Sequence, residues 1–92
     1  MNKEILQKAI DTYGRNMQVD VCIEEMSELT KALIKDRRHN GDNTEDWLNI
    51  IEEIADVKIM LEQVKIMLEC ENEVNEQKKY KLKRLKERLD TE

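Results

Sequence analysis

The stretch TEDWLNIIEEIADVKIMLEQVKIML, residues 44–68, decides the fold of this 92-residue chain. It contains neither proline nor glycine, and its apolar side chains occupy much more than one stripe of the helix that it predicts. A helix that is apolar nearly all round must be covered on several sides, and a chain this short cannot cover it fully. We therefore expect an all-α domain that is completed by oligomerisation.

Three further helices are expected around this stretch. Apolar residues at three- and four-residue spacing favour helices, and the pattern predicts them over about residues 2–13, 17–38, 44–68 and 73–89. Gly14 offers a stop after the first helix, and Asn43 or Thr44 can cap the third. The chain shows no internal repeat or linker, so residues 1–92 are interpreted as one four-helix domain.

The composition agrees with helix-to-helix packing. With one Trp, two Tyr and no Phe, the core must be built from Leu, Ile, Val and Met, whereas β-sheets are enriched in aromatic and β-branched residues. No apolar run approaches the length of about 18 residues that spans a bilayer, so we expect a soluble, cytoplasmic protein with no membrane partner. Cys22 and Cys70 are interpreted as reduced thiols rather than as a disulfide or a zinc site.

Charge is unevenly distributed along the chain, whose net charge is −5. Between Lys78 and Arg88 there are seven basic residues and one acid, Glu87, whereas the preceding chain is acidic. Such a basic helix can pair with acidic helices, reach the phosphates of a small ligand or bind nucleic acid. Because the acidic remainder would repel a DNA backbone, we expect no nucleic-acid partner.

Two short acidic motifs, EEMSE at residues 24–28 and EEIAD at residues 52–56, supply the candidate site. In each motif two carboxylates stand three residues apart, which places them on one face of a helix. Two such helices packed antiparallel would direct four carboxylates toward one point, and like charges at close range raise each other's pKa. A hard divalent cation relieves that repulsion. The predicted metal ligands are Glu25, Glu28, Glu53 and Asp56.

Other metals fit the sequence less well. Residues 42–53 resemble a calcium loop superficially, but Trp47 occupies the sixth position, where the sharp turn demands glycine. A di-iron bundle would supply Glu-x-x-His motifs, and neither acidic motif contains histidine. All-oxygen ligation therefore indicates Mg²⁺, with Mn²⁺ as the alternative.

The arrangement Glu-Glu-x-x-Glu, then 24 residues, then Glu-x-x-Asp resembles the signature of the MazG-like all-α nucleoside triphosphate pyrophosphohydrolases. The resemblance covers roughly residues 18–64, and the short chain resembles the small phage- or prophage-type members. It implies a MazG-like helical bundle that forms a homodimer or a homotetramer. It also implies hydrolysis of a (d)NTP to the monophosphate and pyrophosphate in nucleotide-pool cleansing.

By position in that signature, the four carboxylates named above would be the Mg²⁺ ligands and catalytic residues. The resemblance leaves open whether Glu25 or Glu28 is the general base. It suggests further substrate contacts, mostly cations for the phosphates, at Lys31, Lys81, Arg84, Arg88 and Gln18.

A second hypothesis comes from a different class of protein. The acids could form surface salt bridges, and the basic helix at residues 73–89 could bind an acidic partner, in a non-catalytic interaction or structural protein. A third hypothesis is a family member that binds nucleotide and metal without turnover. The sequence leaves open the preferred base and sugar, the number of metal ions, and whether the working unit is a dimer or a tetramer.

Overall fold

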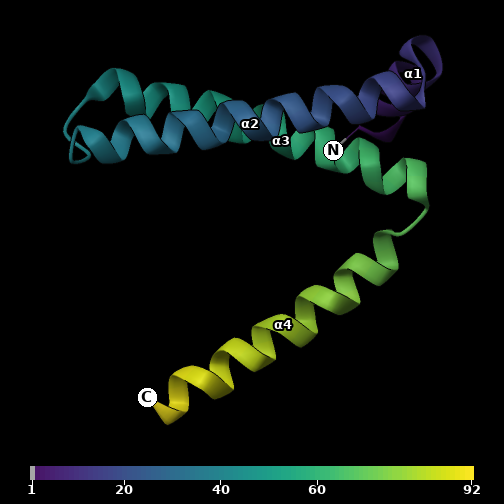
Figure 1. Ribbon diagram of the computed structural model, residues 1–92. Coiled ribbons are helices and arrows are strands. Elements are labelled where there is room, and N and C mark those ends of the chain that lie inside the picture. The colour runs from purple at the N-terminus through teal and green to yellow at the C-terminus, as the bar shows by residue number, and fades with distance from the viewer. Residues whose placement is uncertain (1) are drawn as a thin grey trace.

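The computed structural model describes residues 2–92 and consists of four α-helices, with no strand among these residues (Figure 1). The all-α prediction is confirmed. The helices are α1 (Lys3–Tyr13), α2 (Arg15–Arg38), α3 (Thr44–Leu68) and α4 (Glu71–Thr91).

The helix boundaries follow local capping chemistry. Gly14 alone separates α1 from α2, because its φ of +91° breaks the helix in a conformation that side chains disfavour. For that reason α2 begins two residues before its predicted start. The Asn43 side chain accepts hydrogen bonds from the backbone N–H groups of Glu45 and Asp46, so α3 begins at the predicted residue.

An antiparallel hairpin of α2 and α3 forms the body of the molecule, and α1 packs across one end of it (Figure 1). Buried side chains from both helices line the seam of this hairpin, and within each helix they recur at spacings close to whole turns. They are Gln18, Cys22 and Ala32 from α2, and Asp46, Val57, Met60 and Gln63 from α3. Leu6 is the buried residue of α1.

The opposite end of the hairpin is closed by a polar contact. His39, which caps the carboxyl end of α2, lies with its Nδ1 atom 2.5 Å from Oδ2 of the buried Asp46. The Nζ atom of Lys35 is 4.0 Å from the other oxygen of the same carboxylate. This partnered carboxylate joins the end of α2 to the first turn of α3.

The single chain buries few apolar side chains. Only Leu6, Cys22, Ala32, Val57 and Met60 are buried apolar residues within the part that the structure describes. Many large apolar side chains of α3 remain exposed, namely Trp47, Leu48, Ile51, Ile54, Ile59, Leu61 and Leu68. The expectation that one chain cannot cover this helix agrees with that exposure.

Helix α4 leaves the body instead of packing along it (Figure 1). It starts after Glu69, which takes the left-handed conformation at φ +50° and ends α3. The Nζ atom of Lys3 in α1 is 2.9 Å from Oε2 of Glu71, and this ion pair links α1 to the start of α4. Within one chain, α1 to α3 pack together and α4 is a free arm.

The structure bears on two further expectations, one about membrane-spanning helices and one about the cysteines. None of the helices formed by residues 2–92 is long and apolar enough to cross a membrane. Cys22 and Cys70 are both free thiols, as predicted, and burial raises the pKa of Cys22.

Candidate metal centre

Three of the four predicted ligands meet across the α2–α3 hairpin. Glu25 comes from α2, and Glu53 and Asp56 come from one turn of α3. Each offers a carboxylate oxygen, and these three oxygens all lie within 4.8 Å of one another. The meeting follows from the antiparallel packing of the two helices, because Glu25, Glu53 and Asp56 all lie at or beside the seam between them.

The electrostatics of this group are unfavourable without a cation. Glu25 and Glu53 are half-buried, and the Oε2 atom of Glu53 is buried with no hydrogen-bond partner among residues 2–92. Partial burial raises the pKa of Glu25, and the nearby charges of Asp56 and Glu53 raise it further. No ion pair within residues 2–92 includes any of the three carboxylates.

A small hollow gives access to the group from one side of the hairpin. Its volume is about 140 Å³, and it is lined by Val21, Glu25, Asp56, Ile59 and Met60. Glu25 and Asp56 therefore line a space that is open to solvent. The all-oxygen donor set suits Mg²⁺ or Mn²⁺ better than a softer metal.

Glu28, the fourth predicted ligand, is not part of the group of three. It lies on an exposed position of α2, and its Oε1 atom is 3.4 Å from Nζ of Lys31. The i,i+3 spacing puts Glu28 one turn from Glu25, but on the flank of α2 rather than in the seam. The other acids of the two motifs, Glu24 and Glu52, are exposed.

Gln18 lies in the seam of the hairpin. Its Nε2 atom donates a hydrogen bond of 2.7 Å to Oε1 of Gln63, and both side chains are buried. The amide of Gln63 in turn lies 3.7 Å from the sulfur of Met60. The structure thus gives Gln18 a partner within the chain, and its contact with substrate stays a prediction.

The predicted phosphate contacts lie on two separate elements. Lys31 stands on α2 beside Glu28, one and a half turns beyond Glu25. The others, Lys81, Arg84 and Arg88, are exposed on the free arm α4. The guanidinium of Arg84 lies 5.7 Å from the centre of the Tyr80 ring, a cation–π contact within the arm.

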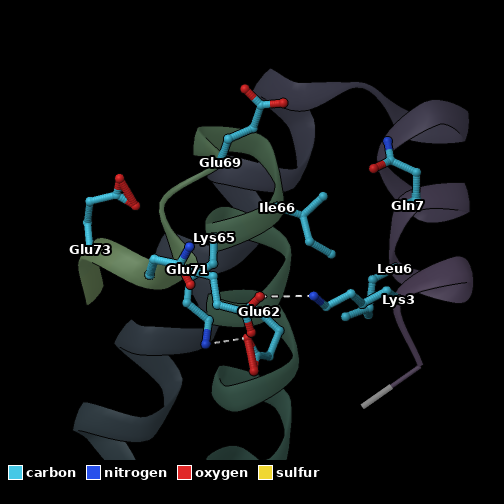
Figure 2. A pocket seen from close by; sticks show the side chains of 10 residues that line it. Lys3, Leu6, Gln7, Glu62, Lys65, Ile66, Glu69, Glu71 and Glu73 are labelled. Carbon is cyan, nitrogen blue, oxygen red and sulfur yellow. Dashed lines mark hydrogen bonds and ion pairs between the residues drawn. The ribbon is translucent and has the colours of Figure 1, made fainter. Parts of the chain in front are cut away.

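A second hollow, of about 430 Å³, lies where α1, α3 and α4 meet (Figure 2). Two of its four carboxylates are paired with lysines. Lys3 pairs with Glu71, and Nζ of Lys65 is 2.6 Å from Oε2 of Glu62. The other two, Glu69 and Glu73, are exposed to water. This hollow therefore needs no cation, in contrast to the site around Glu53.

The sequence interpretation missed the contact between His39 and Asp46. Neither His39 nor Asp46 was among the candidate residues of the sequence. The burial of Asp46 could have been suspected, because Asp46 lies seven residues before Glu53 and so falls on the same face of the helix.

Comparisons with family models, with curated proteins and with solved structures find no match to this chain. The likeness to the MazG-like enzymes therefore rests on the two acidic motifs and their spacing.

Proposed function

We propose that this protein is a Mg²⁺-dependent nucleoside triphosphate pyrophosphohydrolase of the MazG-like type. It would convert a (d)NTP and water to the (d)NMP and pyrophosphate and so cleanse the nucleotide pool. The observation that supports this function is the meeting of Glu25, Glu53 and Asp56, with one buried oxygen of Glu53 left without a partner. Three carboxylates from two helices repel one another unless a cation lies between them.

The residues present fit such a cation. Glu25, Glu53 and Asp56 would hold it from the seam, and the hollow beside Ile59 would give a phosphate group of the substrate access to it. A bound Mg²⁺ or Mn²⁺ would neutralise phosphate oxygens and lower the pKa of a water molecule.

Two residues on the flank of α2 suit the roles of proton acceptor and phosphate-binding cation. The exposed carboxylate of Glu28 stands one turn from Glu25 and outside the group of three, so it can accept a proton from an attacking water. Lys31, 3.4 Å from Glu28, adds positive charge on the same side, where it can balance the phosphates of the substrate.

We further propose that the working unit is a homodimer or a homotetramer. An apolar groove of about 300 Å³ runs along the hairpin between the exposed residues Ile23 and Met26 of α2 and Leu61 and Leu68 of α3. Exposed apolar surface of this kind favours association. A second subunit would complete the MazG-like bundle there.

The test is pyrophosphate release from a panel of ribo- and deoxynucleoside triphosphates with Mg²⁺. Asp56→Asn should abolish turnover because it removes a metal ligand, and Glu24→Gln should keep it because Glu24 is exposed outside the group. The panel also gives the base and sugar preference. No release from any nucleotide by the folded protein would exclude the hydrolase.

The free arm favours a second candidate, a non-catalytic interaction protein. Beyond its first turn, helix α4 is exposed, basic and separate from the body, which suits an acidic partner. Failure of the nucleotide panel, together with a melting temperature that Mg²⁺ does not change, would select this candidate. Mg²⁺ binding without turnover would instead select a member that binds nucleotide without hydrolysing it.

A further inference from the structure

The free arm α4 carries an apolar stripe bordered by cations. The stripe consists of Val74, Leu82, Leu85 and Leu89, whose successive spacings of eight, three and four residues keep them on one side of the helix. Leu82 and Leu89 are 63% and 60% exposed. Lys78 and Lys81 line one hollow together with Val74 and Leu82, so these two cations stand beside the stripe. A partner for this face must be both apolar and acidic.

The net charge of the chain is also divided unevenly between the arm and the rest of the molecule. Seven basic and three acidic residues give residues 78–92 a net charge of +4. The remaining nine basic and 18 acidic residues give residues 1–77 a net charge of −9. The arm and the body therefore attract each other.

The matching surface is the outer side of α3. Leu48, Ala55 and Ile59 recur there at helical spacing, and Leu48 and Ile59 are 54% and 41% exposed. Glu45 and Glu52 are exposed, stand seven residues apart and flank Leu48 by three and four residues, so both acids fall on this same stripe. The outer side of α3 is thus an apolar stripe with acids, which complements the arm.

The arm does not reach this surface within its own chain. Two backbone hydrogen bonds, from Glu69 to Ile66 and from Cys70 to Lys65, fix the end of α3. The ion pair between Lys3 and Glu71 holds the first turn of α4 beside α1, and the arm then points away from the body (Figures 1 and 2). The outer stripe of α3 is left uncovered.

We propose that α4 is an exchange arm that docks on the outer stripe of α3 in a second copy of this chain. Pairing of two arms with each other is disfavoured, because it would bring the cations beside the two stripes, Lys78 and Lys81 in each copy, close together. Reciprocal exchange between two copies covers both arms and both α3 stripes with one symmetric contact. This inference does not rest on the proposed hydrolase function.

The exchange has a consequence for the acidic group. Ile59, in the middle of the α3 stripe, also lines the hollow that holds Glu25 and Asp56. A docked arm would therefore lie beside that hollow and bring cations of the second copy next to the carboxylates of the first.

The test is a charge swap read by the mass of the assembly in light scattering. One variant, Lys78→Glu/Lys81→Glu, reverses the charge of the arm beside its stripe, and a second, Glu45→Lys/Glu52→Lys, reverses the charge of the α3 stripe. In either variant measured alone, like charges would meet where the arm docks. The assembly of that variant should therefore have half the mass of the wild-type assembly. A mixture of the two restores opposite charges at both contacts, and the wild-type mass should return. The control Lys83→Glu/Arg84→Glu changes the charge of α4 equally, on the side away from the stripe, and should keep the wild-type mass.

Three results would overturn the exchange. The wild type could have the 11.0 kDa mass of one chain, or both reversed variants could keep the wild-type mass. The mixture could also stay at half mass while a chain with all four substitutions recovers stability, which would mean that the arm folds back within one molecule. Helix content by circular dichroism verifies folding. Leu82→Gln/Leu89→Gln, which changes no charge, should halve the mass in the same way, and an unchanged mass would also contradict the exchange.

Discussion

Glu53→Gln should stabilise the metal-free protein, although it removes a charged group from its core-facing position. Glu53 has two carboxylate neighbours, Glu25 and Asp56, whose oxygens lie within 4.8 Å. Two unit charges at that separation repel by about 1 kcal/mol at the dielectric constant of water and by about 3.5 kcal/mol at an effective value of 20. Since the group is partly exposed, the value near that of water applies, and the variant should gain about 1 to 2 kcal/mol.

For a domain of this size, such a gain raises the melting temperature by roughly 5 to 10 °C. The assay is thermal unfolding followed by circular dichroism at neutral pH in the presence of a chelator. Glu52→Gln is the matched control, because the adjacent Glu52 is exposed outside the group and should leave the melting temperature unchanged.

Added Mg²⁺ should reverse the order of the two proteins. At one hundred times its dissociation constant, a ligand that binds only the folded state adds about 2.7 kcal/mol, which exceeds the gain expected for the variant, and the wild type should gain this while Glu53→Gln should not. A metal-free Glu53→Gln protein that melts at or below the wild-type temperature would show that the three carboxylates do not repel one another, and the reasoning about the site would be refuted.

Three further predictions follow from single contacts. The pKa of Glu25 is raised above its ordinary 4.5, so the folded state holds the proton of this carboxyl group more tightly than the unfolded state does. The stability that this proton contributes should be present at acid pH and lost as pH rises above 4.5 through the raised pKa. Chemical denaturation should find this trend in the metal-free wild type and not in Glu25→Gln. Gln18→Ala should cost about 1 to 3 kcal/mol because it leaves the buried amide oxygen of Gln63 without its donor, whereas Gln18→Leu/Gln63→Leu should be nearly neutral. A Gln18→Ala protein of unchanged stability would contradict the structural role of this pair. His39→Ala should also lower the free energy of unfolding by about 1 to 3 kcal/mol, because the buried carboxylate of Asp46 loses its closest partner. Urea unfolding measures this loss. No loss would mean that water replaces the imidazole ring of His39.

The sequence was sufficient for the helices, because their signals are local. Asn43 and Gly14 mark helix ends through capping chemistry, and the apolar spacing of α3 fixes its length. The predicted start of α2 was two residues late, because a single glycine suffices to separate it from α1. The predicted end of α4 was two residues early, because no breaker follows Leu89.

The candidate site was predicted only as far as helix periodicity reaches. Spacing of three residues placed Glu53 with Asp56, and antiparallel packing brought Glu25 to them. The same spacing did not distinguish the seam from the flank of α2, where Glu28 lies. That distinction depends on the rotation of α2 about its axis, which is set by long-range packing around residues such as Gln18 and Gln63.

The placement of α4 could not be predicted from local pattern. Its leucine stripe and its cations indicate a helix with a partner, but the two-residue connection after α3 permits either a hairpin or a divergent arm. The left-handed Glu69 and the ion pair between Lys3 and Glu71 accompany the divergent arm in this structure.

Titration with Mn²⁺, followed by electron paramagnetic resonance, tests most directly whether the three carboxylates hold a divalent cation. We expect saturable binding in the wild type, loss of that binding in Asp56→Asn, and retention in Glu28→Gln, because Glu28 lies outside the group. Equal binding in the wild type and in Asp56→Asn, or no binding in the wild type, would contradict a metal centre at Glu25, Glu53 and Asp56.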